Sequence, residues 1–313
     1  MRFLEIQEND AKQRMDRFLQ KYLPQAPKSL LQKWLRTKKI KCNGKRTERD
    51  YILETGDRLS FYLYDEVLAP YERKKRFYRK GKLSVVCEDS DLIILDKPKG
   101  VLTHASQPKD YGHNLVDYLT EYLIEKQEYC PRFEHSFRPC VVNRLDFNTE
   151  GLVIGAKNHE AAMRAAAWIK EGNIKKHYFA LCEGNISKKR ILDMPLLREG
   201  KRMRMAKSSE EGIFAKTEIM PLAYGDNVTL LEVILHTGRY HQIRAHLSSI
   251  GHPLVGDSTY GAKPLKKGCP EGQRLFAYAL HFSDSIDSLF WRGKTVVSER
   301  AESWKEQVLG KNK

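Results

Sequence analysis

The 313-residue chain lacks the features that mark several large protein classes. Its six cysteines are scattered and include no CxxC pair, which argues against a zinc ribbon or a disulfide scaffold and favours reduced thiols. No apolar run approaches the length of a membrane helix, and the N-terminal stretch MRFLEIQEND has no secretory signal pattern. We therefore expect a cytoplasmic protein with no membrane partner.

Acidic residues are too few to balance the basic ones. The chain has 55 lysines and arginines against 40 acids, a net charge of +15, which suits a polyanionic partner but also a merely soluble basic protein. The distribution favours the partner, because residues 1–82 alone hold 22 basic and 11 acidic residues. The basic surplus belongs largely to one module.

That N-terminal module has a readable order of elements. Apolar residues recur at helical spacing in RMDRFLQKYL, which prolines then end, and again in SLLQKWLR, where Ser29 is the expected N-cap. The dipeptide Asn43-Gly44 signals a tight turn, and TGDRLSFYL alternates as a half-buried strand does. The module is predicted to be a small α+β domain.

This pattern resembles the small RNA-binding fold named after ribosomal protein S four. The resemblance covers roughly residues 12–64 and rests on Arg14, Asp16, Ile40, Asn43, Gly44, Gly56 and Asp57. It implies an RNA-binding domain at residues 1–68, with RNA contacts from Lys33, Lys38, Lys39 and Lys45. The alternative for these lysines is an ordinary solvated helix face.

The next segments continue the domain plan. Residues 69–82 include seven lysines and arginines with little apolar periodicity, which predicts a basic linker. From residue 83 onward, strand patterns outnumber helical ones and several lie close enough for antiparallel pairing. The expected strands and helices lie in LSVVCEDSDLIILDKP, NLVDYLTEYLIEK, EAAMRAAAWIKEG, KKHYFALCEG, AKTEIMPLAYG and NVTLLEVILHTG.

An acid stands just before a strand-like apolar run in NRLDFNTEGLVIGAK. Asp146 costs free energy there unless a partner holds its charge. Arg144 lies two residues earlier, so both side chains can face the same side of an extended loop. Spacing alone leaves the alternative open that the two residues form an ion pair that only pins the loop.

A second cluster is HTGRYHQIRAHLSSIGHPLVGDSTYG. The three histidines, His236, His241 and His246, recur every five residues, a helical spacing that does not gather them on a metal ion, so hydrogen-bonding or phosphate-facing roles are favoured. We expect Gly238 to end a strand and Tyr240 to begin a helix. That helix carries Arg244 one turn after His241, and Arg239 and Arg244 are cations of the type that bind carboxylates or phosphates, or are simply surface arginines.

Four segments resemble, in order and spacing, the motifs of the RluA-type pseudouridine synthases. They are DKPKGVLTH, NRLDFNTEGLVIGAK, KKHY, and TGRYHQIRAHL followed by GHPLVGDSTYG. The resemblance spans residues 83–283. It implies a catalytic domain at residues 83–313, of mixed, mainly antiparallel α+β fold with flanking helices and a central cleft. The implied reaction isomerises uridine in ribosomal or transfer RNA without a cofactor or metal, in a protein expected to be a monomer.

The resemblance also implies roles for individual residues. Asp146 matches the catalytic aspartate, which either attacks the anomeric carbon or starts elimination, and Arg244 is its expected partner. Tyr178 would stack on the target base and assist proton transfer, and Arg144 would hold the flipped-out nucleotide. Further substrate contacts are expected from Arg239, His241 and Lys97, the last in a loop beside the cleft.

Two positions depart from the family pattern. Asn143 stands where many members have histidine, and Glu150 where many have serine, which we interpret as variation at the cleft rim that affects substrate choice. Two other functions compete with isomerisation. One is a non-catalytic RNA-binding or ribosome-assembly protein of the same fold. The other is a nuclease or N-glycosidase, and the lack of a second partnered carboxylate at these motifs weighs against it.

Overall fold

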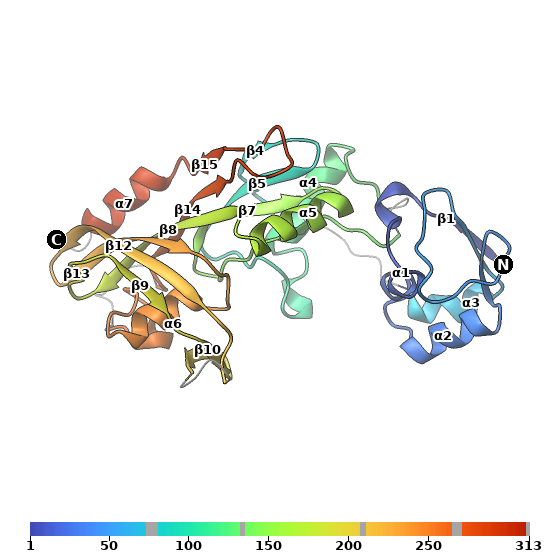
Figure 1. Cartoon of the computed structure of the whole chain (residues 1–313), viewed down its shortest axis with the longest axis horizontal. Helices are drawn as coiled ribbons and strands as arrows, with labels where there is room; N and C mark the ends of the chain where they lie inside the picture. Colours follow the sequence, from blue (N-terminus) through green and yellow to red (C-terminus); the bar gives the residue numbers. More distant parts are fainter. Residues whose placement is uncertain (73–80, 132–134, 207–210, 265–270, 311–313) are drawn as a thin grey trace.

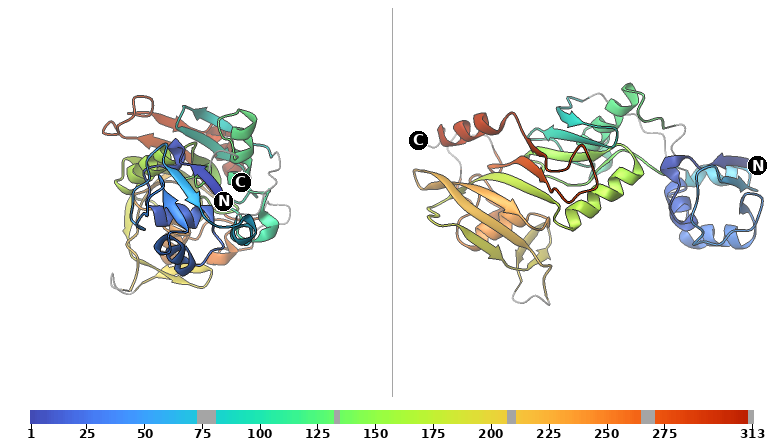
Figure 2. Two further views of the ribbon diagram at one scale, coloured as in Figure 1. Left: turned by 90° about the vertical axis from the view of Figure 1, so that its right-hand side faces the viewer. Right: turned by 45° about the horizontal axis from the view of Figure 1, so that its top comes forward.

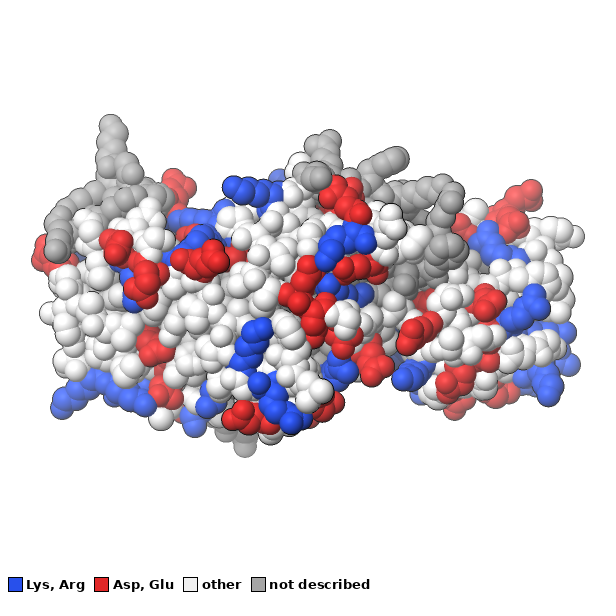
Figure 3. Space-filling model, turned by 90° about the horizontal axis from the view of Figure 1, so that it is seen from above, with Lys and Arg blue, Asp and Glu red and all other residues white. Residues whose placement is uncertain are grey.

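The computed structural model describes residues 1–72, 81–131, 135–206, 211–264 and 271–310. The molecule is elongated, with a small N-terminal unit at one end, a large sheet in the middle, and the two termini at opposite ends (Figure 1). Two further views show the same separation of the N-terminal unit from the sheet (Figure 2). Seen from above, acidic and basic side chains are interspersed, so the positive charge is not concentrated on that face (Figure 3).

The N-terminal unit folds around its own hydrophobic core. Its antiparallel sheet has the order β1-β3-β2. Phe18, Trp34 and Phe61 are buried in a cluster formed entirely by residues of this unit. Its elements are β1 (Arg2–Glu5), a 3-10 turn η1 (Glu8–Asp10), α1 (Met15–Tyr22), α2 (Lys28–Arg36), β2 (Ile40–Cys42), β3 (Arg58–Phe61) and α3 (Asp65–Leu68).

Local sequence signals account for most of these elements. Asn43 and Gly44 both have positive φ, 51° and 74°, the conformation that a two-residue hairpin turn requires. The Asn43 side chain donates to Asp57 at 2.7 Å and so ties the turn to the start of β3. The predicted N-cap is wrong, because α2 begins at Lys28 after Pro27, which places Ser29 inside the helix.

The start of the predicted linker packs onto the N-terminal unit. Ala69–Tyr71 form a 3-10 turn, η2, and the Tyr71 ring meets the Trp34 ring edge-on with centroids 5.9 Å apart. The backbone oxygen of Tyr71 also accepts from the Gln25 amide at 3.3 Å. Residues 73–80, which include most of the predicted linker and its basic run, lie outside the described residues.

The large sheet has ten strands, and its main path runs β4-β5-β7-β14-β8-β13-β12-β9, with β15 on β14 and β6 on β7. Only β7 and β14 pair in parallel among the described strands, so the predicted α+β, mainly antiparallel fold is confirmed. The strands are β4 (Val85–Glu88), β5 (Leu92–Lys97), β6 (Cys140–Val141), β7 (Glu150–Ala156), β8 (Ile174–Glu183), β9 (Arg190–Asp193), β12 (Lys216–Gly225), β13 (Val228–Leu235), β14 (Leu275–Phe282) and β15 (Thr295–Val297). A separate hairpin joins β10 (Leu196–Glu199) and β11 (Arg202–Met205).

Helices cover both faces of this sheet. Along β7, Val153 packs in the cluster that contains α4, whereas Leu152 and Ile154 pack in the cluster that contains α5, as alternation along a strand requires. The helices are α4 (Leu115–Glu125), α5 (His159–Lys170), α6 (Gln242–Ser249) and α7 (Ala301–Gly310), with short 3-10 turns η3 (Pro108–Asp110) and η4 (Ser258–Tyr260). Within the described part of the chain, no helix has the length and apolar character needed to cross a membrane.

A buried carboxylate joins the N-terminal unit to the segment that precedes β6. Asp10 is fully buried and accepts from the Ser136 amide and hydroxyl, both at 2.6 Å, and from the His135 amide at 3.1 Å. Nearby, the His159 amide at the start of α5 donates to Asn9 at 3.2 Å. These contacts set the N-terminal unit against α5.

Candidate active site

A cavity of about 1740 Å³ opens between β8, α6 and the loop that precedes β7. Pockets for single small ligands usually measure about 300–1,000 Å³, so this cavity suits a segment of a larger molecule. Its lining contains eight lysines and arginines against three acids. An anionic polymer fits both the volume and the charge.

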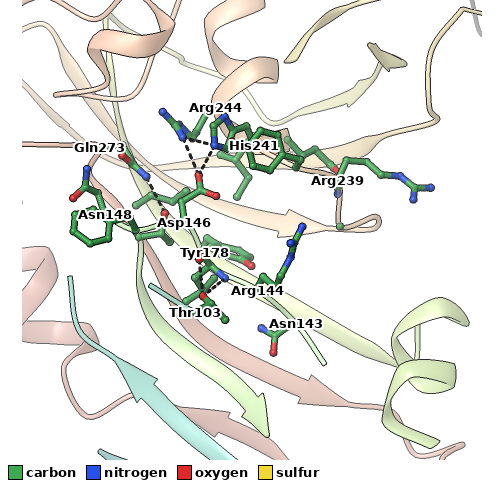
Figure 4. Close-up of a pocket in the computed structure, with 18 of the residues that line it drawn as sticks. Thr103, Asn143, Arg144, Asp146, Asn148, Tyr178, Arg239, His241, Arg244 and Gln273 are labelled. Atoms are coloured by element: carbon green, nitrogen blue, oxygen red, sulfur yellow. Dashed lines mark hydrogen bonds and ion pairs between the residues drawn. The ribbon is translucent and has the colours of Figure 1, made fainter. Parts of the chain in front are cut away.

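The centre of the cavity holds an ion pair between residues 98 positions apart. Arg244 in α6 donates from Nη1 to Oδ2 of Asp146 at 2.9 Å (Figure 4). The Asp146 side chain is 25% exposed and that of Arg244 is 8% exposed, so the carboxylate is open to the cavity while its partner is buried. The Asp146 carboxylate thus contacts a fixed cation on one side and the open cavity on the other.

Arg244 is held in place by a second acid. Its Nε donates to Oδ2 of Asp257 at 2.7 Å and its Nη2 to Oδ1 at 2.8 Å, and the Asp257 side chain is only 1% exposed. Burial opposes the charge of Arg244, but Asp257 and Asp146 outweigh it and raise the pKa of the guanidinium. This two-point contact leaves Nη1 directed at Asp146. Sequence reasoning missed Asp257, although it stands within the GHPLVGDSTYG segment.

His241 completes the contacts around Arg244. Its Nε2 accepts from Arg244 Nη1 at 2.9 Å and lies 3.5 Å from Oδ2 of Asp146. Its Nδ1 lies 3.1 Å from the Tyr260 hydroxyl, and its ring stacks on Tyr240 at 3.7 Å between centroids. Burial lowers the pKa of His241, with the charge on Asp146 opposing. The neutral ring, protonated on Nδ1, satisfies both contacts.

Tyr178 forms part of the cavity wall beside this ion pair. It lies on β8 between Val233 of β13 and Ala277 of β14 and is 5% exposed. Burial, and then the negative charge of Asp146, raise the pKa of its hydroxyl. At neutral pH the ring therefore presents a phenol, which donates a proton, and not a phenolate.

The comparisons with known proteins agree with this geometry. The family model described as RNA pseudouridylate synthase matches residues 91–249, about half of the chain. The chain belongs to this family. The predicted RluA-type pseudouridine synthase is thereby confirmed, and the protein is an enzyme that makes pseudouridine in RNA, which disfavours the non-catalytic and hydrolytic alternatives.

The similarity extends over most of the synthase. The chain is 30% identical over 263 residues to the ribosomal large subunit pseudouridine synthase D of Haemophilus influenzae, and the match covers 83% of this chain and 76% of that protein. For the protein of the same name in Nitrosomonas europaea, the identity is 33% over 282 residues, with 89% and 78% covered. Human RNA pseudouridylate synthase domain containing 4 shares the fold, with a TM-score of 0.56, 19% identity, and 72% and 93% covered.

The loop that carries Asp146 is held by the side chains of Thr103 and Asn143. The Thr103 hydroxyl donates to the Leu145 carbonyl at 2.7 Å and accepts from the Leu145 amide at 3.2 Å. The Asn143 side chain accepts from the Ile154 amide at 2.7 Å and so pairs with β7 as a strand would. Asn143 lines the cavity, as expected, but its amide group is engaged in holding the loop.

Arg144 and Arg239 border the cavity with exposed side chains. Asp146 pairs with Arg244 and not with Arg144, so the alternative of a local ion pair within the loop is wrong. Arg239 donates from Nε to the Phe214 carbonyl at 2.9 Å. The guanidinium groups of Arg144 and Arg239 extend to the same side, away from Arg244 (Figure 4).

Lys97 does not occupy the substrate-contacting position predicted for it. The residue is completely buried, and its ammonium donates to the carbonyls of Val101 at 2.7 Å, Pro98 at 3.1 Å and Phe147 at 3.3 Å. Burial lowers the pKa of Lys97 to about 8, with the charge of Asp146 opposing. The correction agrees with the loop-shaping role also expected of Lys97, because Phe147 directly follows Asp146.

Glu150 is also placed differently from the prediction. Glu150 is absent from the cavity lining. Its carboxylate instead accepts a hydrogen bond at 2.9 Å from Nη1 of Arg300, the residue that precedes α7. Arg300 also bonds the buried Asp96 through both carboxylate oxygens. This network joins β5, β7 and the C-terminal segment, so Glu150 belongs to the sheet framework and not to the cleft rim.

The histidine cluster separates in space. His236 pairs with Glu218 at 3.2 Å near the end of β13. His246 is fully buried and bonded to the Thr217 hydroxyl and the Met194 carbonyl, which agrees with the hydrogen-bonding role expected for the histidines and not with the phosphate-facing one. The structure also corrects the boundaries, since β13 ends at Leu235 and α6 begins at Gln242. Over the described ranges, no three His, Cys, Asp or Glu side chains gather as metal ligands do.

The four lysines predicted to contact RNA lie in the N-terminal unit, away from the cavity. They are all exposed, and none forms an ion pair with an acid in the part of the chain that the structure describes. They are Lys33, Lys38, Lys39 and Lys45. Each of these four lysines is therefore accessible to a bound RNA.

Proposed function

We propose that this synthase isomerises uridine in ribosomal RNA, with Asp146 as the carboxylate that acts on the ribose. The observation that carries the proposal is the ion pair of Asp146 with Arg244, which Asp257 holds at the centre of a cationic cavity. A carboxylate that is ionised and open on one side is what either attack at the anomeric carbon or elimination requires. The ribosomal substrate is suggested by the names of the relatives.

The neighbouring residues support complementary roles. Tyr178 would stack on the uracil and move a proton through its phenol, and the exposed Arg144 would hold the flipped-out nucleotide. Arg239 would contact the RNA strand at the cavity edge. Both ring nitrogens of His241 are engaged by protein groups, so this histidine would position Arg244 instead of contacting RNA.

The reaction moves the uracil from one atom of attachment to another and conserves every atom. It therefore needs no redox cofactor. We propose that it uses no metal either, so a metal chelator should leave the activity unchanged. The N-terminal unit would add sequence-independent contacts to phosphates through its exposed lysines. We place the enzyme in the cytoplasm, where ribosomal RNA is modified, and expect it to act as a monomer.

Asp146→Asn tests the proposal, because it keeps the size of the side chain and removes the charge. The variant should fold and bind RNA, and its turnover should fall by at least about 10³-fold, as expected when a group acts only in the transition state. Pseudouridine is measured in ribosomal RNA from cells that carry the wild-type or variant gene and in purified RNA after single turnover. Turnover within tenfold of the wild type would refute the role of Asp146.

A further inference from the structure

Lys176 is a buried lysine in the wall of the cavity. It lies on β8, where its register partners are Leu235 of β13 and Leu280 of β14. The residue is 7% exposed and lines the cavity. Side chains two positions apart point to the same face of a strand, so Lys176 and Tyr178 share this wall, about 7 Å apart along β8.

Its ammonium differs from those of the other buried lysines. The described residues include three buried lysines, namely Lys97, Lys157 and Lys176. Lys97 donates to three carbonyls, and Lys157 pairs with Glu88 at 2.6 Å and Glu128 at 2.7 Å. The ammonium of Lys176 forms no hydrogen bond or ion pair with the residues that the structure describes. The Lys176 ammonium therefore faces the cavity with its donors uncommitted, and an anion that enters the cavity can accept hydrogen bonds from it.

The surroundings of Lys176 point to the charge of that partner. Burial, and then the positive charge of Arg239, lower the pKa of the ammonium. Gly238 permits this arrangement, because a Cβ at that position would lie 3.1 Å from the Lys176 Nζ. Arg239 donates a hydrogen bond from Nε to the Phe214 carbonyl, and its two terminal nitrogens form no hydrogen bond with the described residues. Two adjacent cations without an acid form a site for an anion.

We propose that Lys176 and Arg239 together bind a phosphodiester that flanks the target uridine. The inference rests on the proposed function, in which Asp146 meets the ribose and Tyr178 the uracil. Every ribose within an RNA strand carries a phosphodiester on each side. The distance of about 7 Å between Lys176 and Tyr178 along β8 suits a phosphodiester next to the uridine whose base contacts Tyr178. Asp146 offers no competing charge for this anion site, because Arg244 already neutralises it.

The sign of the stability change separates this role from a structural one. Lys176→Met removes the charge and keeps the length of the side chain in an apolar wall. If the ammonium gains a partner only when RNA binds, the variant without RNA should unfold at the same temperature as the wild type or at a higher one. Lys175→Met is the matched control, since Lys175 is exposed on the opposite face of β8 and loses the same charge.

Binding is measured to a seven-nucleotide RNA of cytidines with one central uridine. Four such RNAs are compared: the native one, one with a neutral methylphosphonate on the 5′ side of the uridine, one with it on the 3′ side, and one with it two linkages away. All proteins carry Asp146→Asn, so that no turnover disturbs the equilibrium. The parent protein should lose about tenfold or more in affinity with one flanking neutral linkage, as for a hydrogen bond between charged groups.

On the native RNA, Lys176→Met should bind more weakly than the parent by the same factor of about tenfold. On the RNA whose flanking neutral linkage weakens the parent, Lys176→Met should lose no further affinity. Lys175→Met should bind all four RNAs as the parent does. The proposal is overturned if Lys176→Met binds within twofold of the parent, if the neutral linkage still weakens it in full, or if it unfolds at a lower temperature. In proteins that keep Asp146, a slower reaction of Lys176→Met that no flanking neutral linkage reproduces would assign Lys176 to the base and also overturn the proposal. Failure of the proposed function is seen separately, as turnover by Asp146→Asn.

Discussion

The cavity and the N-terminal unit both carry cations, but they hold them in opposite ways. In the cavity, Arg244 is buried against Asp257 and Asp146 with contacts of 2.7–2.9 Å. In the N-terminal unit, Lys33 and Lys39 are exposed and free of acid partners among the described residues. Charges fixed at low solvent exposure act through their geometry, whereas exposed charges act through their number.

This contrast sets different tolerances to substitution. A buried ion pair depends on each member, because removal of one leaves the other uncompensated. An exposed lysine contributes one phosphate contact among several, and the sum is screened by salt. The predictions below test the contrast from the largest expected effect to the smallest.

Asp257→Asn should have the largest effect. It halves the two-point contact that directs Arg244, so we expect the single-turnover rate at saturating RNA to fall about 10²-fold, as for a small misplacement of a catalytic group. The free energy of unfolding should fall by about 3 kcal/mol, because a buried charge loses its partner. Rates are measured by quench-flow with pseudouridine detection, and stability by thermal and urea unfolding.

Glu271→Gln is the matched control for this substitution. It removes one negative charge from the same cavity at an exposed position, so the rate should stay within about threefold of the wild type. If Asp257→Asn and Glu271→Gln slow the reaction equally, the effect comes from the net charge of the cavity. The positioning of Arg244 would then be discarded as its cause.

Asp10→Ala should have an intermediate effect, on the junction between the two regions. Three donors from Ser136 and His135 lose a buried acceptor, which we expect to weaken the docking of the N-terminal unit by about 2–3 kcal/mol. RNA affinity should fall while the rate at saturating RNA stays unchanged. Limited proteolysis and salt-dependent binding report the docking, and Lys12→Ala, which breaks only an exposed pair with Glu160, should change little.

The same junction should weaken at acidic pH. Burial lowers the pKa of His135 and of His159, and the charge of Asp10 opposes the shift in both. A histidine whose folded pKa is lowered takes up its proton more readily in the undocked or unfolded form, so the docked state loses stability as pH falls below about 6.5. Proteolysis between the two regions should therefore be faster at pH 5.5 than at pH 7.5. Equal rates at both pH values would contradict this.

The exposed lysines should give the smallest effects one at a time. Alanine at any one of Lys33, Lys38, Lys39 or Lys45 should change RNA affinity by only a few-fold at moderate salt. All four together should flatten the plot of log affinity against log salt by roughly 3 units, since each phosphate contact contributes about 0.7–0.9. Four Lys→Arg substitutions should leave the slope unchanged. An unchanged slope in the alanine variant would remove these residues from the RNA-binding surface.

Local signals in the sequence determined most of the elements. The turn at Asn43-Gly44, the helices α1, α4 and α5, and the strands β4, β5, β8, β12 and β13 follow from periodicity and turn chemistry within a few residues. The acid Asp146 is conspicuous in the sequence because it stands before an apolar strand. Its partner Arg244 followed from the family resemblance, since nothing local joins residues 98 positions apart.

Only the tertiary structure decided which polar side chains pair with one another and which become buried. The insertion of β14 between β7 and β8 makes the loop of Asp146, the wall of Tyr178 and Lys176, and α6 converge on one cavity. It also buried Lys97 and His246, which look like surface groups in the sequence, and it gave Asp257 to Arg244 and Arg300 to Glu150. A side chain's local sequence determines which strand or helix it joins, but its partner depends on which distant strands lie side by side.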